Sequence, residues 1–127
     1  MLVLKGRGLV PGKAKGPLLK IYKPVSPLGD INSEKGTVHI DGMEISLQRK
    51  ILFLPYTVGS TVGAYIFYKL SKNSIAPLAI IAEKADIVLL SGCIISKIPL
   101  VDGIKPEVLL GSIIEIDGST GEVKIYL

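Results

Sequence analysis

Continuous and alternating apolar runs divide this chain into two kinds of predicted strand. Three runs are continuously aliphatic, the pattern of strands buried on both faces. They are Ile51–Leu54, Leu78–Ala82 and Pro99–Val101. Between the first two, the apolar positions of Thr61–Ser71 recur at helical spacing. Between the second and third, Ala85–Leu90 predicts a short helical turn with Gly92 near its end. The order strand, helix, strand, helix, strand implies parallel pairing through right-handed crossovers.

The rest of the chain has the short runs, separated by glycine, that are typical of antiparallel strands. We expect these strands at Leu2–Lys5, Pro17–Tyr22, Thr37–Asp41, Met43–Leu47, Ser112–Asp117 and Glu122–Tyr126. Gly42 predicts a hairpin or a bend, and Gly118–Gly121 predicts the turn of a closing hairpin. Segment 23–36 predicts a loop, and Pro106–Leu110 a short helix. Together these patterns predict one mixed α/β domain over residues 1–127, with parallel central strands, antiparallel β elements and helices on one side.

The charge of the chain restricts its partners only weakly. The formal net charge is +4, and the basic residues gather near the start of the chain. They are Lys5, Arg7, Lys13, Lys15, Lys20 and Lys23. The aromatic content of 6% and the lack of a stacking motif argue against a nucleic-acid surface. A small anionic substrate and a solvated basic face both fit this charge.

Apolar residues are more abundant than in a typical globular domain. Ala, Val, Ile, Leu, Met, Phe, Trp, Cys and Gly make up about 55% of the chain, against the usual 45–50%. No stretch approaches the roughly 18 apolar residues of a membrane span, and we expect no membrane association. The first residues also lack the basic-then-apolar pattern of a secretory leader, so we expect none. We expect the surplus apolar residues to cover a surface that faces a partner protein.

The metal-binding and catalytic residue types are scarce. Cys93 is the lone cysteine and His39 the lone histidine, so we expect no metal site, no cluster and no disulfide in this chain. Cys93 fits a buried small hydrophobe in a protein of a reducing compartment, and we expect the cytoplasm. A Ser-His-Asp hydrolase is disfavoured because Ser60 directly follows Gly59, which departs from the G-x-S-x-G pattern.

The segment Pro55–Gly63 holds the best candidate site. Two glycines, Gly59 and Gly63, bracket Ser60 and Thr61 where a strand should become a helix. A hydroxyl at this point can cap the helix, and the free N–H groups of the first turn favour an anion. The same dipoles would stabilise an alkoxide, so Ser60 could act as a base. A capped helix without chemistry remains the alternative.

The ordered set of short motifs resembles the small subunit of aconitase-X-type hydro-lyases. The motifs cover most of the chain, from about Lys5 to Gly103. They are Gly6-Arg7, Gly12-x-Ala14-x-Gly16, Gly29-Asp30, Leu54-Pro55, Gly59-Ser60-Thr61-Val62-Gly63, Ala76-Pro77-x-Ala79-Ile80, Gly92 and Ile98-Pro99-Leu100-Val101. The tail from Leu110 to Val123 also looks like the closing hairpin of mobile phosphohistidine domains. The histidine that those domains need is replaced here by Ser60-Thr61.

The resemblance implies a fold, a reaction and a partner. The fold would be the swivelling β/β/α domain of aconitase, and the chain would be active only with a large subunit. That subunit would hold a [4Fe-4S] cluster, while Ser60 would act as the general base. The expected reaction is dehydration of mevalonate 5-phosphate to the trans-anhydro acid in archaeal isoprenoid biosynthesis. Gly59, Thr61 and Arg7 are the expected substrate-binding residues.

One departure from the family pattern concerns the residues before Gly59. The family usually carries a basic residue and a glycine there, whereas this chain has Thr57 and Val58. Arg7 or a residue of the large subunit would then supply the cation. Two alternative functions stay open: a dehydratase subunit for another hydroxy acid, such as a hydroxyproline, and a non-catalytic anion-binding or scaffold domain.

Overall fold

The strands of the chain form two sheets. The computed structural model describes all residues from 1 to 127. The larger sheet has eight strands, in the spatial order β1 (Leu2–Lys5), β11 (Glu122–Tyr126), β10 (Ile113–Asp117), β3 (Lys13–Lys20), β7 (Ile51–Leu54), β8 (Ala79–Ala82), β9 (Leu100–Asp102) and β2 (Arg7–Val10). The smaller sheet has three strands, β4 (Ile31–Asn32), β5 (Thr37–Ile40) and β6 (Met43–Ser46).

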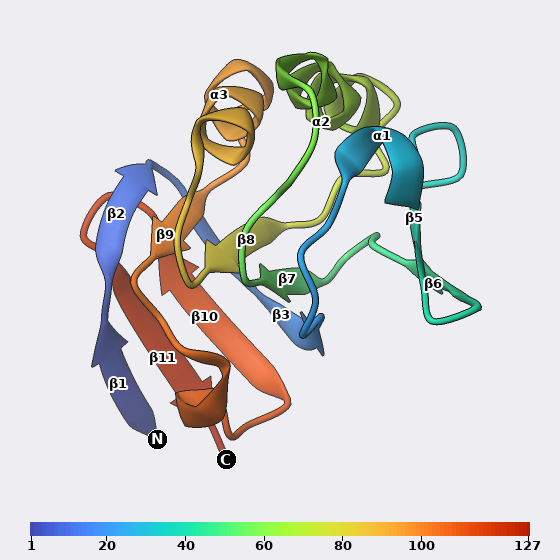
Figure 1. The fold of residues 1–127 in the computed structure, drawn as a ribbon. Helices are drawn as coiled ribbons and strands as arrows, with labels where there is room; N and C mark the ends of the chain where they lie inside the picture. Colours follow the sequence, from blue (N-terminus) through green and yellow to red (C-terminus); the bar gives the residue numbers. More distant parts are fainter.

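Three α-helices and two 3₁₀ turns complete the fold. They are α1 (Pro27–Asp30), η1 (Thr61–Gly63), α2 (Ala64–Lys72), α3 (Ile87–Ser96) and η2 (Pro106–Val108). Helices α2 and α3 pack side by side, both on the same side of β7 and β8, while the hairpin of β10 and β11 lies on the other side (Figure 1). The predicted helix Thr61–Ser71 is confirmed as η1 continued by α2.

The central strands are parallel, as the aliphatic runs predict. Ile51 of β7 is in register with Ala79 of β8, and Ile80 of β8 with Leu100 of β9. Strand β3 also pairs in parallel with β7, a pairing that the sequence pattern did not indicate. The remaining pairs are antiparallel, and the hairpins β5–β6 and β10–β11 form where glycine turns predict them.

Strand β7 separates two hydrophobic cores. Ile51 and Phe53 belong to a core that also contains the inner faces of β10 and β11. Leu52 and Leu54, on the opposite face of the strand, belong to a core shared with α2 and α3. All four side chains of β7 are almost fully buried, because each face of the strand meets its own layer. The chain is therefore layered as β hairpins, central strands and helices (Figure 1).

Helix α3 is longer than predicted. The expected end near Gly92 is wrong, because the helix continues to Ser96 and ends at Lys97, whose φ is 57°. The structure gives Gly92 a packing role instead. A Cβ atom there would lie only 2.6 Å from the ring of Phe67, so glycine allows α2 and α3 to approach closely.

Segment 23–36 is also more ordered than the predicted loop. It contains α1 and the short strand β4. Ser26 caps α1 by accepting from Gly29 N–H at 3.3 Å, and Pro27 occupies the first helical turn. In addition, Arg7–Val10 forms strand β2, and β3 begins at Lys13, four residues before the predicted start at Pro17.

Candidate functional site

The loops that leave the carboxyl ends of the parallel strands are tied together at one edge of the sheet. Lys84, after β8, donates its N–H to the carbonyl of Pro55, after β7, at 3.0 Å. Gly103, after β9, donates its N–H to the carbonyl of Glu83 at 3.1 Å. Ligand sites of open α/β sheets occur at this edge, and the Pro55–Gly63 segment begins there.

Ser60 is exposed at the start of η1, where the predicted cap occurs. Its backbone is extended, with φ −69° and ψ 148°, and its Oγ accepts from Val62 N–H at 3.3 Å. The N–H groups of Ser60 and Thr61 have no hydrogen-bond partner within the chain. The Ser60 hydroxyl therefore lies on the surface beside backbone N–H groups that have no partner. This position leaves it accessible to a bound molecule.

The two flanking glycines serve different purposes. Gly59 has φ +104°, a conformation that L side chains rarely adopt, so it provides the turn before Ser60. Gly63 is buried, and a Cβ atom there would lie 3.3 Å from Pro27 and 3.4 Å from Val88. The second glycine thus lets the start of α2 pack closely against α1 and α3.

The loop before Ser60 runs beside the chain that follows β3. Val25 N–H donates to Tyr56 O at 3.2 Å, and Val58 N–H donates to Val25 O at 3.0 Å. This pairing brings Ser26 next to the glycine turn, because a Cβ atom on Gly59 would lie 3.4 Å from Ser26 Oγ. Two capping serines from distant parts of the sequence are therefore neighbours.

Asp86 fastens the same loop to helix α3. Its Oδ1 accepts from Thr57 N–H at 2.7 Å, and its Oδ2 accepts from the Thr57 hydroxyl. Oδ2 also caps α3 by accepting from Val88 N–H at 3.2 Å and Leu89 N–H at 3.4 Å. One carboxylate thus satisfies backbone donors of the loop and of the helix.

Arg7 lies on β2 and pairs with Asp102 at the end of β9. Its Nε and Nη2 donate to the two carboxylate oxygens at 2.8 and 2.7 Å, and Asp102 Oδ2 also accepts from Ala85 N–H at 2.9 Å. Burial would raise the pKa of Asp102, but the hydrogen bonds from Arg7 and Ala85 and the charge of Arg7 outweigh it and lower that pKa. The hydrogen bonds to Asp102 and the charge of its carboxylate raise the pKa of Arg7.

The structure places the four predicted site residues in two groups. Gly59, Ser60 and Thr61 stand together at η1. Arg7 is linked to them indirectly, since Asp102 binds the backbone of Ala85, the residue before Asp86. Arg7 keeps a 70% exposed side chain, and its Nη1 makes no hydrogen bond within the chain.

Sequence reasoning missed three residues that shape this site: Ser26, Thr57 and Asp86. Two of them carried a local signal, because Ser26 precedes a proline and Asp86 precedes an apolar run, both typical of helix caps. Thr57 carried none, since its role depends on a partner 29 residues away.

The residues of this chain do not fit an iron–sulfur cluster. No group of three or more His, Cys, Asp or Glu side chains lies close enough together to hold a metal ion. Cys93 is fully buried in the core under α3, and burial raises the pKa of its thiol, which disfavours the thiolate that a cluster requires. A membrane-crossing helix is also absent, because none of the helices is long and apolar enough.

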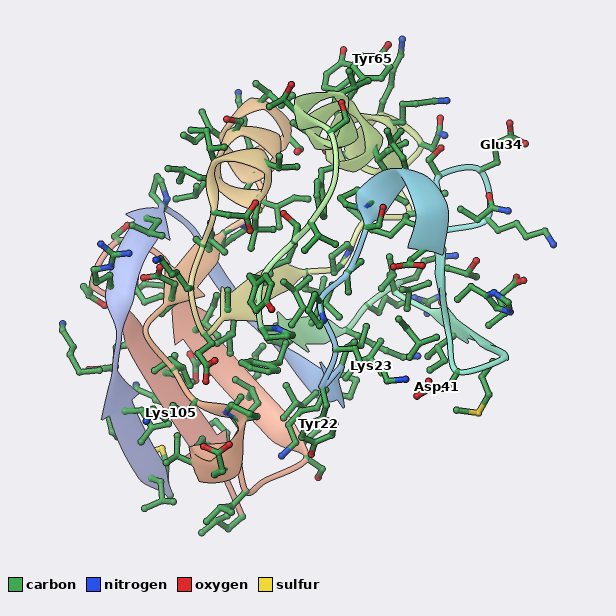
Figure 2. All side chains as sticks on the ribbon, viewed as in Figure 1. Tyr22, Lys23, Glu34, Asp41, Tyr65 and Lys105 are labelled. Carbon is green, nitrogen blue, oxygen red and sulfur yellow. The ribbon has the colours of Figure 1, made fainter.

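Large apolar side chains are exposed on the segments that meet around Ser60. We call this set the apolar collar: Leu28 of α1, Val58 of the loop, Val62 of η1 and Ile87 of α3. The exposed fractions reach 62% for Val62 and 66% for Ile87. Tyr65, in the first turn of α2, also projects into solvent (Figure 2). Other large apolar side chains, such as Val3, Ile94 and Ile95, are exposed elsewhere on the chain. Those near Ser60 are available for contact with another protein.

Comparison with known proteins places this chain and its fold in a family. The sequence matches the family described as the aconitase X swivel domain over residues 3–125. A phosphomevalonate dehydratase small subunit from Thermococcus kodakarensis is 44% identical over 126 residues, which span 96% of this chain and 95% of that protein. The protein of the same name from Methanosarcina acetivorans is 37% identical, over 96% of this chain and 90% of that one.

A solved structure agrees with the sequence matches. The crystal structure of Thermococcus kodakaraensis aconitase X, holo-form, superposes with a TM-score of 0.95 at 41% sequence identity, over 100% of both chains. The resemblance noted in the sequence, and the swivelling mixed α/β fold that it implies, are confirmed. This chain belongs to the aconitase X swivel domain family.

Proposed function

We propose that this chain is the small subunit of a hydro-lyase that dehydrates mevalonate 5-phosphate to trans-anhydromevalonate 5-phosphate in archaeal isoprenoid biosynthesis. The relatives named phosphomevalonate dehydratase small subunit, matched over nearly their full length, support the reaction. The observation that carries the site assignment is the position of Ser60. Its hydroxyl is exposed at the mouth of η1, beside unpaired backbone N–H groups and inside the apolar collar.

Ser60 acts as the general base in this proposal. Its deprotonated Oγ takes the proton from the carbon next to the substrate carboxylate, and the electron pair of that C–H bond forms the new double bond. The hydroxyl group leaves with the electrons of its C–O bond. The proton then passes from Ser60 to solvent, so that one water in total is lost. The Val62 N–H already bonded to Oγ and the free N–H of Thr61 stabilise the alkoxide.

Gly59, Thr61 and Arg7 bind the anionic groups of the substrate. Gly59 opens the backbone at the turn, and the exposed Thr61 offers its hydroxyl. Arg7 presents Nη1 on its exposed side while Asp102 fixes the rest of the guanidinium. Because Thr57 is buried and bonded to Asp86, it supplies no polar group to the substrate in place of the family's basic residue.

A large subunit completes the enzyme. The relatives are named small subunits, and the apolar collar gives this chain a surface for a protein partner around its candidate base. We assign the [4Fe-4S] cluster to that subunit, because the residues of this chain do not fit one. When bound, the cluster supplies a Lewis acid that polarises the departing hydroxyl. A soluble cytoplasmic complex is the setting that we propose.

The test is a complex of this chain with the large subunit, assayed for dehydration of mevalonate 5-phosphate. We expect Ser60→Ala to lower kcat by about 10²-fold or more, the scale of lost acid–base catalysis, with a much smaller change in KM. Ser74→Ala is the matched control, since Ser74 is also exposed but lies after the far end of α2. It should keep the kcat of the unchanged complex.

Other outcomes separate the parts of the proposal. Near-normal turnover in Ser60→Ala would show that the base is another group. Faster turnover of a hydroxyproline than of mevalonate 5-phosphate would replace the substrate but keep the reaction class. If this chain binds no large subunit and remains a colourless monomer, the enzyme assignment as a whole is wrong.

A further inference from the structure

We propose that Asp86 is a positioning residue for Ser60, acting through Thr57. The inference rests on the proposed role of Ser60 as the base and adds the group that holds it in place. Asp86 does not touch the substrate in this proposal. Its carboxylate fixes the loop that carries Ser60 to the end of helix α3, by hydrogen bonds to the main chain and side chain of Thr57.

Thr57 is the inner attachment of an otherwise exposed loop. Between Tyr56 and Val62 it is the only buried residue, with 5% of its surface exposed. Its side chain turns inward to Asp86, while Val58, Gly59, Ser60 and Thr61 all face solvent. Only Val58 and Gly59 lie between this attachment and the proposed base. The location of Ser60 Oγ therefore depends on how firmly Thr57 is held.

The second attachment of the loop cannot replace the first. Val25 binds Tyr56 and Val58 through backbone hydrogen bonds, which keep the loop beside the segment after β3. Those bonds leave the distance between the loop and α3 open, because Val25 belongs to neither. A backbone bond from Lys84 N–H to Pro55 O also ties the start of the loop to the chain that leads into α3. Asp86 is the side chain that bonds both to the loop and to α3 itself, since its Oδ2 accepts from Thr57 and from the first turn of the helix.

Asp86 is itself held from the other side of the site. The N–H of the preceding Ala85 donates to Asp102 Oδ2 at 2.9 Å, and Asp102 is fixed by two hydrogen bonds from Arg7. A continuous series of contacts thus runs from Arg7 through Asp102, Ala85 and Asp86 to Thr57. It relates the proposed anion-binding arginine to the proposed base, so that both keep one geometry with respect to a bound substrate.

The inference also accounts for the departure from the family pattern before Gly59. In this chain position 57 holds a buried hydroxyl bonded to the Asp86 carboxylate, where the family usually has a basic side chain. In this chain residue 57 attaches the loop to Asp86. The positive charge that binds the anionic substrate then comes from Arg7 or from the large subunit.

The experiment replaces Thr57 and leaves Asp86 in place, so that the cap of α3 is kept. Thr57→Val has nearly the same shape but lacks the hydroxyl, and its N–H still reaches Oδ1. In the complex with the large subunit we expect kcat to fall on the order of 10-fold to 10²-fold, because small misplacements of catalytic groups have effects of this size. KM should change less than threefold. Thr57→Ser restores the hydroxyl and should return kcat to within about threefold of the original.

Ser71→Ala is the matched control for lost stability. Ser71 Oγ donates to Ser96 O at 3.1 Å, a half-buried hydrogen bond between α2 and α3 at the end away from Ser60. We expect it to lower Tm about as much as Thr57→Val does, with kcat unchanged. If the Thr57–Asp86 bond only stabilised the fold, Thr57→Val and Ser71→Ala would have the same kcat.

The possible results bear separately on the two proposals. If Ser60→Ala loses turnover but Thr57→Val keeps its kcat, Ser60 remains the base and the positioning role of Asp86 is wrong. If Thr57→Val raises KM with kcat unchanged, the loop matters for binding and the inference is again wrong. If Ser60→Ala keeps its turnover, the base assignment fails first, and Asp86 has no base to position.

Discussion

Arg7 and Asp102 form a two-pronged ion pair across 95 residues of sequence, with donor–acceptor distances of 2.8 and 2.7 Å. The carboxylate of Asp102 is 1% exposed, whereas the arginine side chain is 70% exposed. The pair therefore joins a solvent-facing cation to a buried anion at the end of β9. Its loss would leave a buried carboxylate with one backbone donor.

The first prediction is that Arg7→Ala affects both stability and binding. The variant should unfold at a lower Tm as an isolated chain, because Asp102 loses its counter-ion. In the complex it should raise KM for the anionic substrate, because Nη1 is removed. Lys13→Ala is the control, since the exposed Lys13 lies 4.0 Å from the half-buried Asp117, a long ion pair that should contribute little. An unchanged KM would assign Arg7 to the structure alone.

The second prediction concerns acid unfolding. The pKa of Asp102 is lowered in the folded chain, so the charged form stabilises the fold at every pH above the ordinary value of about 3.9. That stabilisation is lost as the pH falls from this value through the lowered folded pKa. Asp102→Asn removes the titrating group, so its free energy of unfolding should fall less steeply between about pH 5 and pH 2 than that of the unchanged chain. Chemical denaturation at each pH measures this, and equal slopes would contradict it.

The third prediction is that Cys93 is inert in the folded chain. Its side chain is fully buried and the pKa of its thiol is raised by burial. We expect no reaction with an aromatic disulfide reagent at neutral pH, and full reaction after addition of guanidinium. The rate of labelling should follow unfolding when the denaturant concentration is varied. Rapid labelling under native conditions would show that the core around α3 is open.

The fourth prediction concerns the apolar collar. Val62→Asp and Ile87→Asp place a charge among exposed apolar groups, which costs little in the free chain but opposes burial against a partner. We expect at least 10-fold weaker binding of the large subunit in a titration by calorimetry. Val3→Asp is the control, because Val3 is 52% exposed on β1, far from the collar. Unchanged binding by Val62→Asp and Ile87→Asp would place the interface elsewhere, and equal weakening by Val3→Asp would show that the effect is not specific to the collar.

The fifth prediction separates strain from function at Gly59. Gly59→Ala and Gly42→Ala each force alanine into a positive φ, at +104° and +76°, with no atom closer than 3.4 Å to the new methyl group. Both should lose roughly 1–2 kcal/mol of stability. Only Gly59→Ala should lower kcat, because Gly42 lies in the β5–β6 turn. If Gly59→Ala keeps the kcat of the unchanged complex, the position of Ser60 does not depend on the positive φ of residue 59, and the prediction is wrong.

The sequence predicted the elements whose signals are local. The aliphatic run Ile51–Leu54 gives β7 with the same bounds, and the glycines after Asp117 give the closing hairpin. The loop around Ser60 could be predicted because glycine followed by serine, between an apolar run and a helical pattern, is typical of a turn and a helix cap. Its helix cap is observed, while the catalytic role of Ser60 stays a prediction.

Features that depend on distant partners could not be predicted. Arg7 lies in a strand because β9 pairs with it, although its neighbours Gly6 and Gly8 suggest turns. The partnership of Thr57 and Asp86 has no pattern in sequence, since it arises only after β7 and β8 are aligned. Gly92 misled the prediction of the end of α3 because its purpose is contact with Phe67, and tight packing overrides helix propensity.

The central strands contribute alternate side chains to both cores, and this has a mechanical consequence. Moving the helices away from β7 would expose Leu52 and Leu54, and moving the hairpin away would expose Ile51 and Phe53, so displacing either layer breaks a packed interior. Close-packed interiors resist such deformation. If this chain opens and closes over a bound molecule, it therefore turns as one stiff block, and the pivot must lie where it meets its companion polypeptide.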